Sequence, residues 1–150
     1  MGNLIGSSTA EIDAPLETVW AVVEDVERAP NWQGGMKGLT ALDRDGQGRA
    51  VRCEVSTDMK VRTVKTIVAF DYGAAPASLS WSQEKGDLKS VDGSWELEDL
   101  GDGRTRATYR IEADLGRILG ALVRGPVEGA IRDMLAGARA GELKQTVEGA

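Results

Sequence analysis

Histidine is absent from the 150 residues of the chain, and cysteine occurs only once, as Cys53. The absence of histidine excludes Ser-His-Asp and Cys-His catalysis, the HExxH metal site and haem held by a proximal histidine. A single cysteine excludes an intrachain disulfide and a zinc site built from paired thiolates. We therefore expect a protein without a metal site and without a cofactor.

Long apolar runs and an excess of basic residues are also missing. No apolar run approaches the roughly 20 residues that cross a bilayer, and the first residues lack the basic segment and apolar stretch of a signal peptide. Lysine and arginine total 18 against 24 aspartate and glutamate, so the net charge of −6 disfavours contact with phosphate backbones. We expect a cytoplasmic monomer or homodimer that does not bind nucleic acid.

The N-terminal part of the chain predicts a strand and then short helices. A chain of this length has room for one domain with its own core, so we assign residues 1–150 to a single domain. A strand is expected over 4–12, a helix over 15–26 with Pro15 in its first turn, and a second helical turn near 27–29. The first helix carries apolar residues at helical spacing: Leu16, Val19, Trp20 and Val23.

The middle of the chain, residues 37–113, consists of short runs separated by turn residues and predicts six antiparallel strands in a meander. Turns such as Gly101-Asp102-Gly103 are too short for the crossover that parallel strands require. Apolar and polar residues alternate, so that Trp95 and Tyr109 face away from Glu96 and Glu112. One face of the sheet is therefore expected to be buried and the other solvated.

The last third returns to helical spacing and predicts a long helix over 126–147 that restarts at Gly125-Pro126. Its apolar stripe must pack on the concave face of the sheet. The residues at this spacing are Leu119, Leu122, Val123, Val127, Ile131, Met134, Leu135 and Ala138. The whole pattern predicts an α+β fold.

Five segments are informative together with this order of elements: Ile12-Asp13-Ala14-Pro15, Pro30-Asn31-Trp32, Asp92-Gly93-Ser94-Trp95-Glu96-Leu97, Gly103-Arg104-Thr105-Arg106-Ala107-Thr108-Tyr109 and Leu143-Lys144-Gln145-Thr146-Val147-Glu148. With these segments, the order of elements resembles the helix-grip fold of the START-like (SRPBCC) superfamily. That superfamily includes bacterial polyketide cyclase/dehydrase and lipid-transport proteins, the coenzyme-Q-binding family and the birch-pollen-allergen family. The resemblance implies a seven-stranded curved antiparallel sheet wrapped around a long C-terminal helix, with two short helices after the first strand.

The resemblance also implies an internal cavity between sheet and helix, and aromatic walls with a polar tip suit a planar or lipidic ligand. Trp32 lies in a glycine-flanked loop, where it either borders the cavity mouth or closes the loop. Cys53 falls on an inward face, as a core residue or a ligand contact. The complete set of candidate ligand-binding residues is Trp32, Cys53, Trp81, Gln83, Trp95, Tyr109, Val127, Ile131 and Met134.

Catalytic chemistry has no clear signature in the sequence. Tyr109 and Gln83 are inward polar candidates, and Lys65 joins them in one of two equally regular registers of its strand. Arg52 and Arg62 fall on faces expected to be exposed, so the role of the arginine often found in aromatase/cyclase pockets is not assigned to a residue of this sequence. The carboxylates Glu54, Glu84, Glu96, Glu98 and Glu112 are all expected to face outward.

Residues 116–124 join the last strand to the long helix and carry Arg117 and Arg124 seven positions apart, on one side of any helix formed there. Apolar neighbours and glycines suggest a hinged gate to the cavity that makes transient contact with a membrane surface. A short helix that only caps the sheet edge is the alternative interpretation.

The sequence thus predicts a carrier or binding protein for a hydrophobic small molecule such as a lipid, a quinone or a polyketide-like compound. The alternative is a polyketide cyclase, aromatase or dehydratase that uses the same cavity. A third interpretation is a stress or interaction domain in which the cavity is incidental. No catalytic residue can be assigned from the sequence.

Overall fold

The computed structural model describes residues 3–150. Its strands are β1 (Asn3–Ile12), β2 (Met36–Arg44), β3 (Ala50–Asp58), β4 (Thr63–Asp71), β5 (Ser78–Gly86), β6 (Ser90–Gly101) and β7 (Arg104–Asp114). Its helices are α1 (Leu16–Glu24), the 3-10 helix η1 (Val26–Asn31), α2 (Gly116–Leu122), α3 (Pro126–Arg132), the π-helical turn η2 (Asp133–Gly137) and α4 (Arg139–Glu148). None of the helices within 3–150 is long and apolar enough to cross a membrane.

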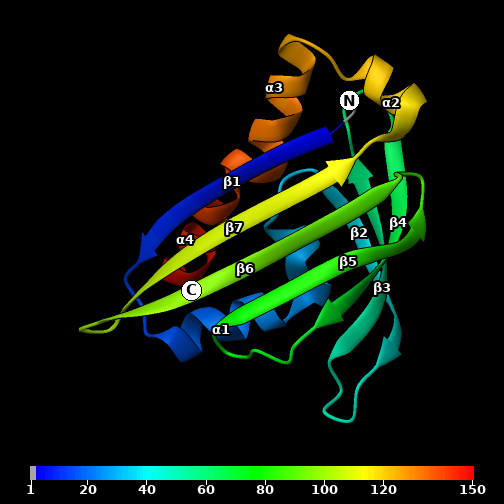
Figure 1. Cartoon of the computed structure of the whole chain (residues 1–150). Helices are drawn as coiled ribbons and strands as arrows, with labels where there is room; N and C mark the ends of the chain where they lie inside the picture. Colours follow the sequence, from blue (N-terminus) through cyan, green and yellow to red (C-terminus); the bar gives the residue numbers. More distant parts are fainter. Residues whose placement is uncertain (1–2) are drawn as a thin grey trace.

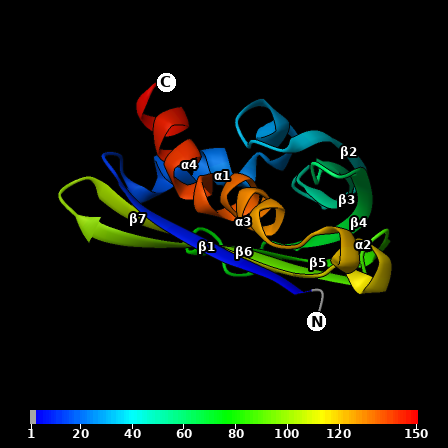
Figure 2. The same ribbon diagram turned by 90° about the horizontal axis from the view of Figure 1, so that it is seen from above.

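The seven strands form one antiparallel sheet in the order β1-β7-β6-β5-β4-β3-β2. Strands β2 to β7 are a meander in which each strand pairs with the next, and β1 joins the far edge beside β7 (Figure 1). The sheet curves, so that β2, β3 and β4 rise beside the helices while β1, β7 and β6 pass beneath them (Figure 2). The predicted helix-grip architecture is confirmed.

Alternation along the strands determines which side chains enter the core. Trp95 pairs with Tyr109 across β6 and β7, and both are buried. On the opposite face of the sheet, Glu54, Glu84, Glu96, Glu98 and Glu112 are exposed, as expected. On β6 and β7 the buried face and the solvated face therefore follow from residue spacing.

The register of β4 decides the orientation of Lys65. Cys53 pairs with Val68 and Val55 with Thr66, so the inward residues of β3 lie opposite the inward residues of β4. Lys65 falls between them on the other face and is exposed. It is therefore removed from the cavity candidates, because its alternative orientation would bury an ammonium group.

The C-terminal helix begins at Pro126, as predicted, and reaches Glu148, but it contains a π-helical turn. The backbone N–H of Ala138 bonds to the carbonyl of Asp133 at 2.9 Å, five residues back, so η2 holds one more residue than an α-helical turn would. The helix packs mainly over β1 and β7 (Figure 2). A Cβ at Gly6 of β1 would lie 2.6 Å from Ala136 Cβ, so this glycine allows the close approach of helix and sheet.

Residues 116–124 contain the short helix α2, which follows the end of β7. Leu119 and Val123 are buried against a core cluster that includes Leu4 and Met59. Because α2 ends at Leu122, Arg124 lies beyond it, and the prediction that Arg117 and Arg124 share one helix side is wrong. Both arginines are nevertheless exposed.

Candidate functional site

A cavity of about 120 Å³ lies between the concave face of the sheet and the C-terminal helix. Its walls come from two core clusters, one containing Trp95 and Tyr109 and the other containing Leu4 and Met59. An engineered apolar cavity of roughly 150 Å³ admits benzene, so this space suits a group the size of one aromatic ring. Most of the residues that line it are aliphatic or aromatic.

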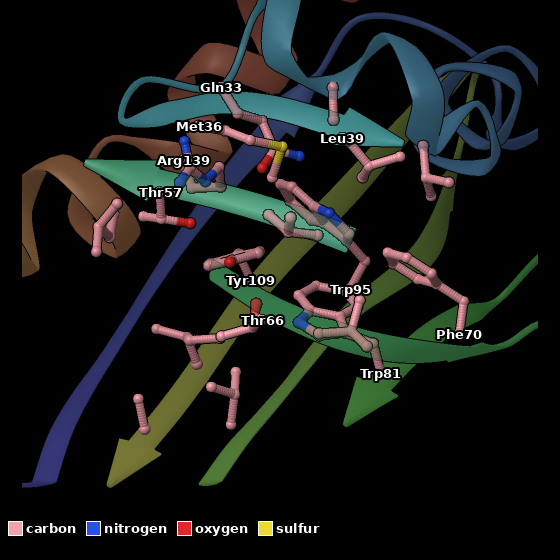
Figure 3. Close-up of a pocket in the computed structure, with 18 of the residues that line it drawn as sticks. Gln33, Met36, Leu39, Thr57, Thr66, Phe70, Trp81, Trp95, Tyr109 and Arg139 are labelled. Atoms are coloured by element: carbon pink, nitrogen blue, oxygen red, sulfur yellow. The ribbon is translucent and has the colours of Figure 1, made fainter. Parts of the chain in front are cut away.

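Aromatic side chains form one continuous wall of the cavity (Figure 3). The ring centroids of Trp95 and Tyr109 are 4.8 Å apart, and those of Trp81 and Tyr109 are 5.7 Å apart. Trp32, which follows η1, extends the wall at 6.2 Å from Trp95, and Phe70 extends it at 5.8 Å from Trp81. All four pairs are tilted, and their centroid separations fall within the range of about 4.5–7 Å in which aromatic rings attract one another.

Gly93 of β6 provides the space that Trp81 occupies. The two residues pair across β5 and β6, and a Cβ at Gly93 would overlap the indole of Trp81. The ring of Trp81 on β5 thus fills the space that a side chain at position 93 of β6 would occupy. This arrangement holds Trp81 against the cavity.

Gly93→Ala is expected to displace Trp81 and to lower the free energy of unfolding by about 1–3 kcal/mol, as overpacking does. Urea denaturation and near-ultraviolet circular dichroism measure the two effects. Gly38→Ala in β2 is the matched control, because a Cβ there meets no atom within 4 Å. An unchanged dichroism spectrum in Gly93→Ala would contradict this account of the Trp81 position.

Arg139 is the charged side chain that the sequence did not predict at this site. Only 3% of its side chain is exposed, and its Nη1 donates to Glu142 Oε1 at 2.8 Å and to the Gly34 carbonyl at 3.0 Å. Glu142 Oε2 also accepts the Gly34 N–H at 2.9 Å. Arg139 and Glu142 therefore hold both polar groups of Gly34 and fix the loop that carries Trp32.

Tyr109 lies beneath this ion pair, with the guanidinium carbon of Arg139 5.6 Å from its ring centroid. Burial raises the pKa of Tyr109 above its usual value, and the positive charge of Arg139 only partly opposes this effect. The hydroxyl is therefore protonated at neutral pH and can donate a hydrogen bond. Thr57, Thr66 and Gln33 are the other polar residues that line the cavity.

Four of the predicted ligand-binding residues line the cavity: Trp32, Trp81, Trp95 and Tyr109. Gln83 does not, because its Nε2 donates to the Leu88 carbonyl at 2.9 Å and so closes the turn between β5 and β6. The contact expected for Gln83 is therefore replaced by a structural hydrogen bond within the hairpin.

Cys53 is fully buried in the core cluster around Trp95 but does not line the cavity. Of the two predicted positions, a core residue or a ligand contact, the structure places Cys53 in the core. Burial raises the pKa of the Cys53 thiol from 9.0 to about 11, with Glu27 adding a smaller effect in the same direction.

This raised pKa predicts a loss of stability in base. Between pH 9 and about 11 the unfolded chain releases the Cys53 proton while the folded chain retains it, so the free energy of unfolding falls as pH rises. The fall attributable to this residue is on the order of 2 kcal/mol. Urea denaturation from pH 8 to 11 measures it, and Cys53→Ala is the comparison. Parallel curves for the two proteins would contradict the prediction.

The helix residues predicted for the site occupy other positions. Val127 is 37% exposed, Ile131 packs in the cluster around Leu4, and Met134 lies near Gly35, where a Cβ would be 3.0 Å from Met134 Cε. The helix instead lines the cavity with Leu135 and Arg139.

The extra residue in η2 explains why helical spacing from Ile131 does not predict Arg139 at the site. Seven positions beyond Ile131, a regular helix would bury Ala138, but in the structure Ala138 is exposed and Arg139 is buried. The spacing of Leu143 and Val147, counted backwards by four, leads to Arg139 instead. The two ends of the helix thus predict inward positions that differ by one residue, and this difference indicates the extra residue of η2 in the sequence.

Comparisons with known proteins agree with this fold. The family model for polyketide cyclase/dehydrase and lipid transport matches residues 5–148. A START superfamily protein from Mycobacterium smegmatis has a TM-score of 0.80 at 23% identity, over 97% of both chains. The protein TTHA0849 from Thermus thermophilus has a TM-score of 0.79 at 18% identity, also over 97% of both chains.

A further similar structure is the Zhui aromatase/cyclase from Streptomyces sp. R1128, with a TM-score of 0.78 at 17% identity, over 97% of this chain and 94% of that one. At these identities the structural likeness establishes the fold alone. A search of curated proteins gives no match. Since the family model covers nearly the whole sequence, the chain belongs to the polyketide cyclase/dehydrase and lipid transport family.

Proposed function

We propose that the protein binds a hydrophobic small molecule in this cavity and acts as its carrier. The observation that supports this most directly is the aromatic wall of Trp32, Trp81, Trp95 and Tyr109 around an unfilled apolar space. Packed cores contain few voids larger than a water molecule, so a cavity of about 120 Å³ is a place for a ligand rather than a packing detail. Burial of an apolar ligand against these rings supplies the binding energy.

The test is native mass spectrometry of freshly purified protein, followed by denaturing extraction of any bound compound. We expect a bound hydrophobic species or, with emptied protein, quenching of tryptophan fluorescence by members of a panel of lipids, quinones and aromatic polyketides. No bound species and no quenching by any member of the panel would refute the proposal.

Polyketide cyclisation or dehydration in the same cavity is the second candidate function. The observation in its favour is the presence of Arg139 and protonated Tyr109 on one apolar space, since such groups can bind the carbonyl oxygens of a reactive chain and hold it in a folded shape. Incubation with a poly-β-ketone substrate distinguishes the two functions: a cyclase accelerates formation of the aromatic product, whereas a carrier returns the substrate unchanged.

The surface of α2 supports transient contact with an anionic membrane during loading. Ile118 is 76% exposed and Leu122 54% exposed, beside the cation of Arg117. The buried face of the same helix packs on Leu4 and Met59, which line the cavity. A movement of α2 onto a bilayer would therefore uncover that end of the cavity.

Replacing Ile118 and Leu122 together by aspartate is expected to abolish most co-sedimentation with phosphatidylserine vesicles, because it removes the apolar contact and adds repulsion. Leu42→Asp on β2, where the leucine is 44% exposed, is the matched control. Equal sedimentation of the double variant and the unmodified protein would rule out α2 as the membrane contact.

A further inference from the structure

Within residues 3–150, the guanidinium of Arg139 makes its hydrogen bonds to Glu142 and Gly34 through one nitrogen. Nη1 makes both of the hydrogen bonds described above, to Glu142 and to the Gly34 carbonyl. Nε is buried and has no hydrogen-bond partner among residues 3–150. In a planar guanidinium the Nε–H and one Nη2–H point the same way, so they form a fork that can hold one oxygen or a pair of oxygens.

An unpartnered buried N–H is costly, and native proteins leave few of them. Arg139 lines the apolar cavity beside Tyr109, on the helix side of the aromatic wall (Figure 3). The protein thus keeps a strong donor at the edge of a space that otherwise offers mainly carbon. A bound oxygen atom would satisfy this donor.

The charge of the site specifies which kind of oxygen fits. Glu142 lies 2.8 Å from Nη1 and neutralises the guanidinium. Arg139 is the charged residue among those that line the cavity in the described chain. A carboxylate ligand would therefore be a second anion on one cation, in an apolar space where an uncompensated charge is strongly unfavourable. A ketone or quinone oxygen accepts the same hydrogen bonds without adding charge.

We propose that Arg139 selects ligands that carry an uncharged carbonyl oxygen, held by its Nε–H and Nη2–H, with the apolar remainder of the ligand against the tryptophans. This inference rests on the proposed binding function and narrows its ligand class to ketones, quinones and polyketide-like compounds. Hydrocarbons and ionised fatty acids are bound less tightly.

Three probes of nearly the same shape test the selection: acetophenone, α-methylstyrene and benzoate. The first two differ only in the exchange of the carbonyl oxygen for a CH₂ group, and the third carries a carboxylate. Dissociation constants come from ligand-observed nuclear magnetic resonance. Acetophenone is expected to bind at least about 10-fold more tightly than α-methylstyrene, the factor typical of a hydrogen bond from a charged donor. Benzoate is expected to bind more weakly than acetophenone.

The double variant Arg139→Met with Glu142→Gln removes both charges together and is expected to reduce the preference for acetophenone to less than about 3-fold. Arg139→Lys, which retains a cation but lacks the fork, is expected to lose most of the preference as well. The matched control is Arg132→Met with Glu128→Gln, an i, i+4 pair on the same helix that does not line the cavity. Its preference should stay unchanged.

Infrared spectroscopy of acetophenone bound to the unmodified protein requires no variant to fold. Its C=O stretch should lie at lower frequency than in hexane, as in hydrogen-bonded ketones. Equal affinity of the unmodified protein for acetophenone and α-methylstyrene, an unshifted stretch, or tighter binding of benzoate would overturn the assignment of Arg139 while leaving the cavity as a binding site. Binding of none of the three probes would instead contradict the proposed binding function for ligands of this size.

Discussion

Glu142→Ala is expected to lower the free energy of unfolding by about 3 kcal/mol. The substitution leaves the guanidinium of Arg139, whose side chain is only 3% exposed, without its counter-charge. It also removes the acceptor of the Gly34 N–H, 2.9 Å away, and so releases the loop that carries Trp32. The expected loss lies at the lower end of the range for broken buried ion pairs, because the Glu142 side chain is itself 22% exposed.

Urea denaturation measures this loss, and Glu128→Ala is the matched control. Glu128 forms an ion pair of the same 2.8 Å length with Arg132 four residues away, but its side chain is 40% exposed, so its removal should cost less than about 1 kcal/mol. Adding Arg139→Met to Glu142→Ala should restore part of the stability, since the uncompensated charge is then gone. If Glu142→Ala and Glu128→Ala unfold at the same urea concentration, the pair does not carry the stability assigned to it.

Trp95→Ala is expected to destabilise the protein by about 3–5 kcal/mol, the largest effect among the predicted substitutions. Trp95 is 2% exposed and is the largest fully buried side chain among the described residues. It contacts the ring of Tyr109 and lies beside Trp32, so its removal breaks the aromatic wall at its centre.

The matched variant is Trp81→Ala, which removes a side chain of the same size from a partly buried position in the same wall. Thermal unfolding and urea denaturation should show a much lower stability for Trp95→Ala than for Trp81→Ala. The enlarged cavity of Trp95→Ala should also admit larger aromatic ligands, if the variant is stable at the temperature of the assay. A smaller loss for Trp95→Ala than for Trp81→Ala would show that the wall is anchored elsewhere.

Strand patterns predicted the fold because the sheet has one solvated face. The inward Trp95 is followed by the outward Glu96 and the inward Tyr109 by the outward Arg110, and a shift of register by one would bury these charges. The sequence does not determine the register of β4, because Thr63, Lys65, Ile67 and Ala69 alternate as regularly as their neighbours. Only the pairing with Cys53 and Val55 of β3 determines the register, and this pairing is a contact between two strands that the alternation within β4 does not contain.

The candidate site was predicted less completely, for two physical reasons. Strand alternation places Trp95 and Tyr109 in the aromatic wall, and Trp81, at the same spacing on the preceding strand, could be placed there with them. The helix side could not, since a π-helical turn changes no residue type and becomes visible only when the stripes on either side of it are compared. The hydrogen bonds of Gln83 and Arg139 likewise depend on loops whose paths the sequence does not specify.

The extra residue of η2 also affects how this chain is aligned with its relatives. In a relative whose helix is regular throughout, matching from Ile131 onward would place Ala138 at the position that lines the cavity, whereas matching back from Leu143 would place Arg139 there. The two alignments differ by one inserted residue within η2, and an alignment without gaps does not show it. A family-wide search for arginine at this position therefore has to be anchored on α4, where the helix regains its regular period.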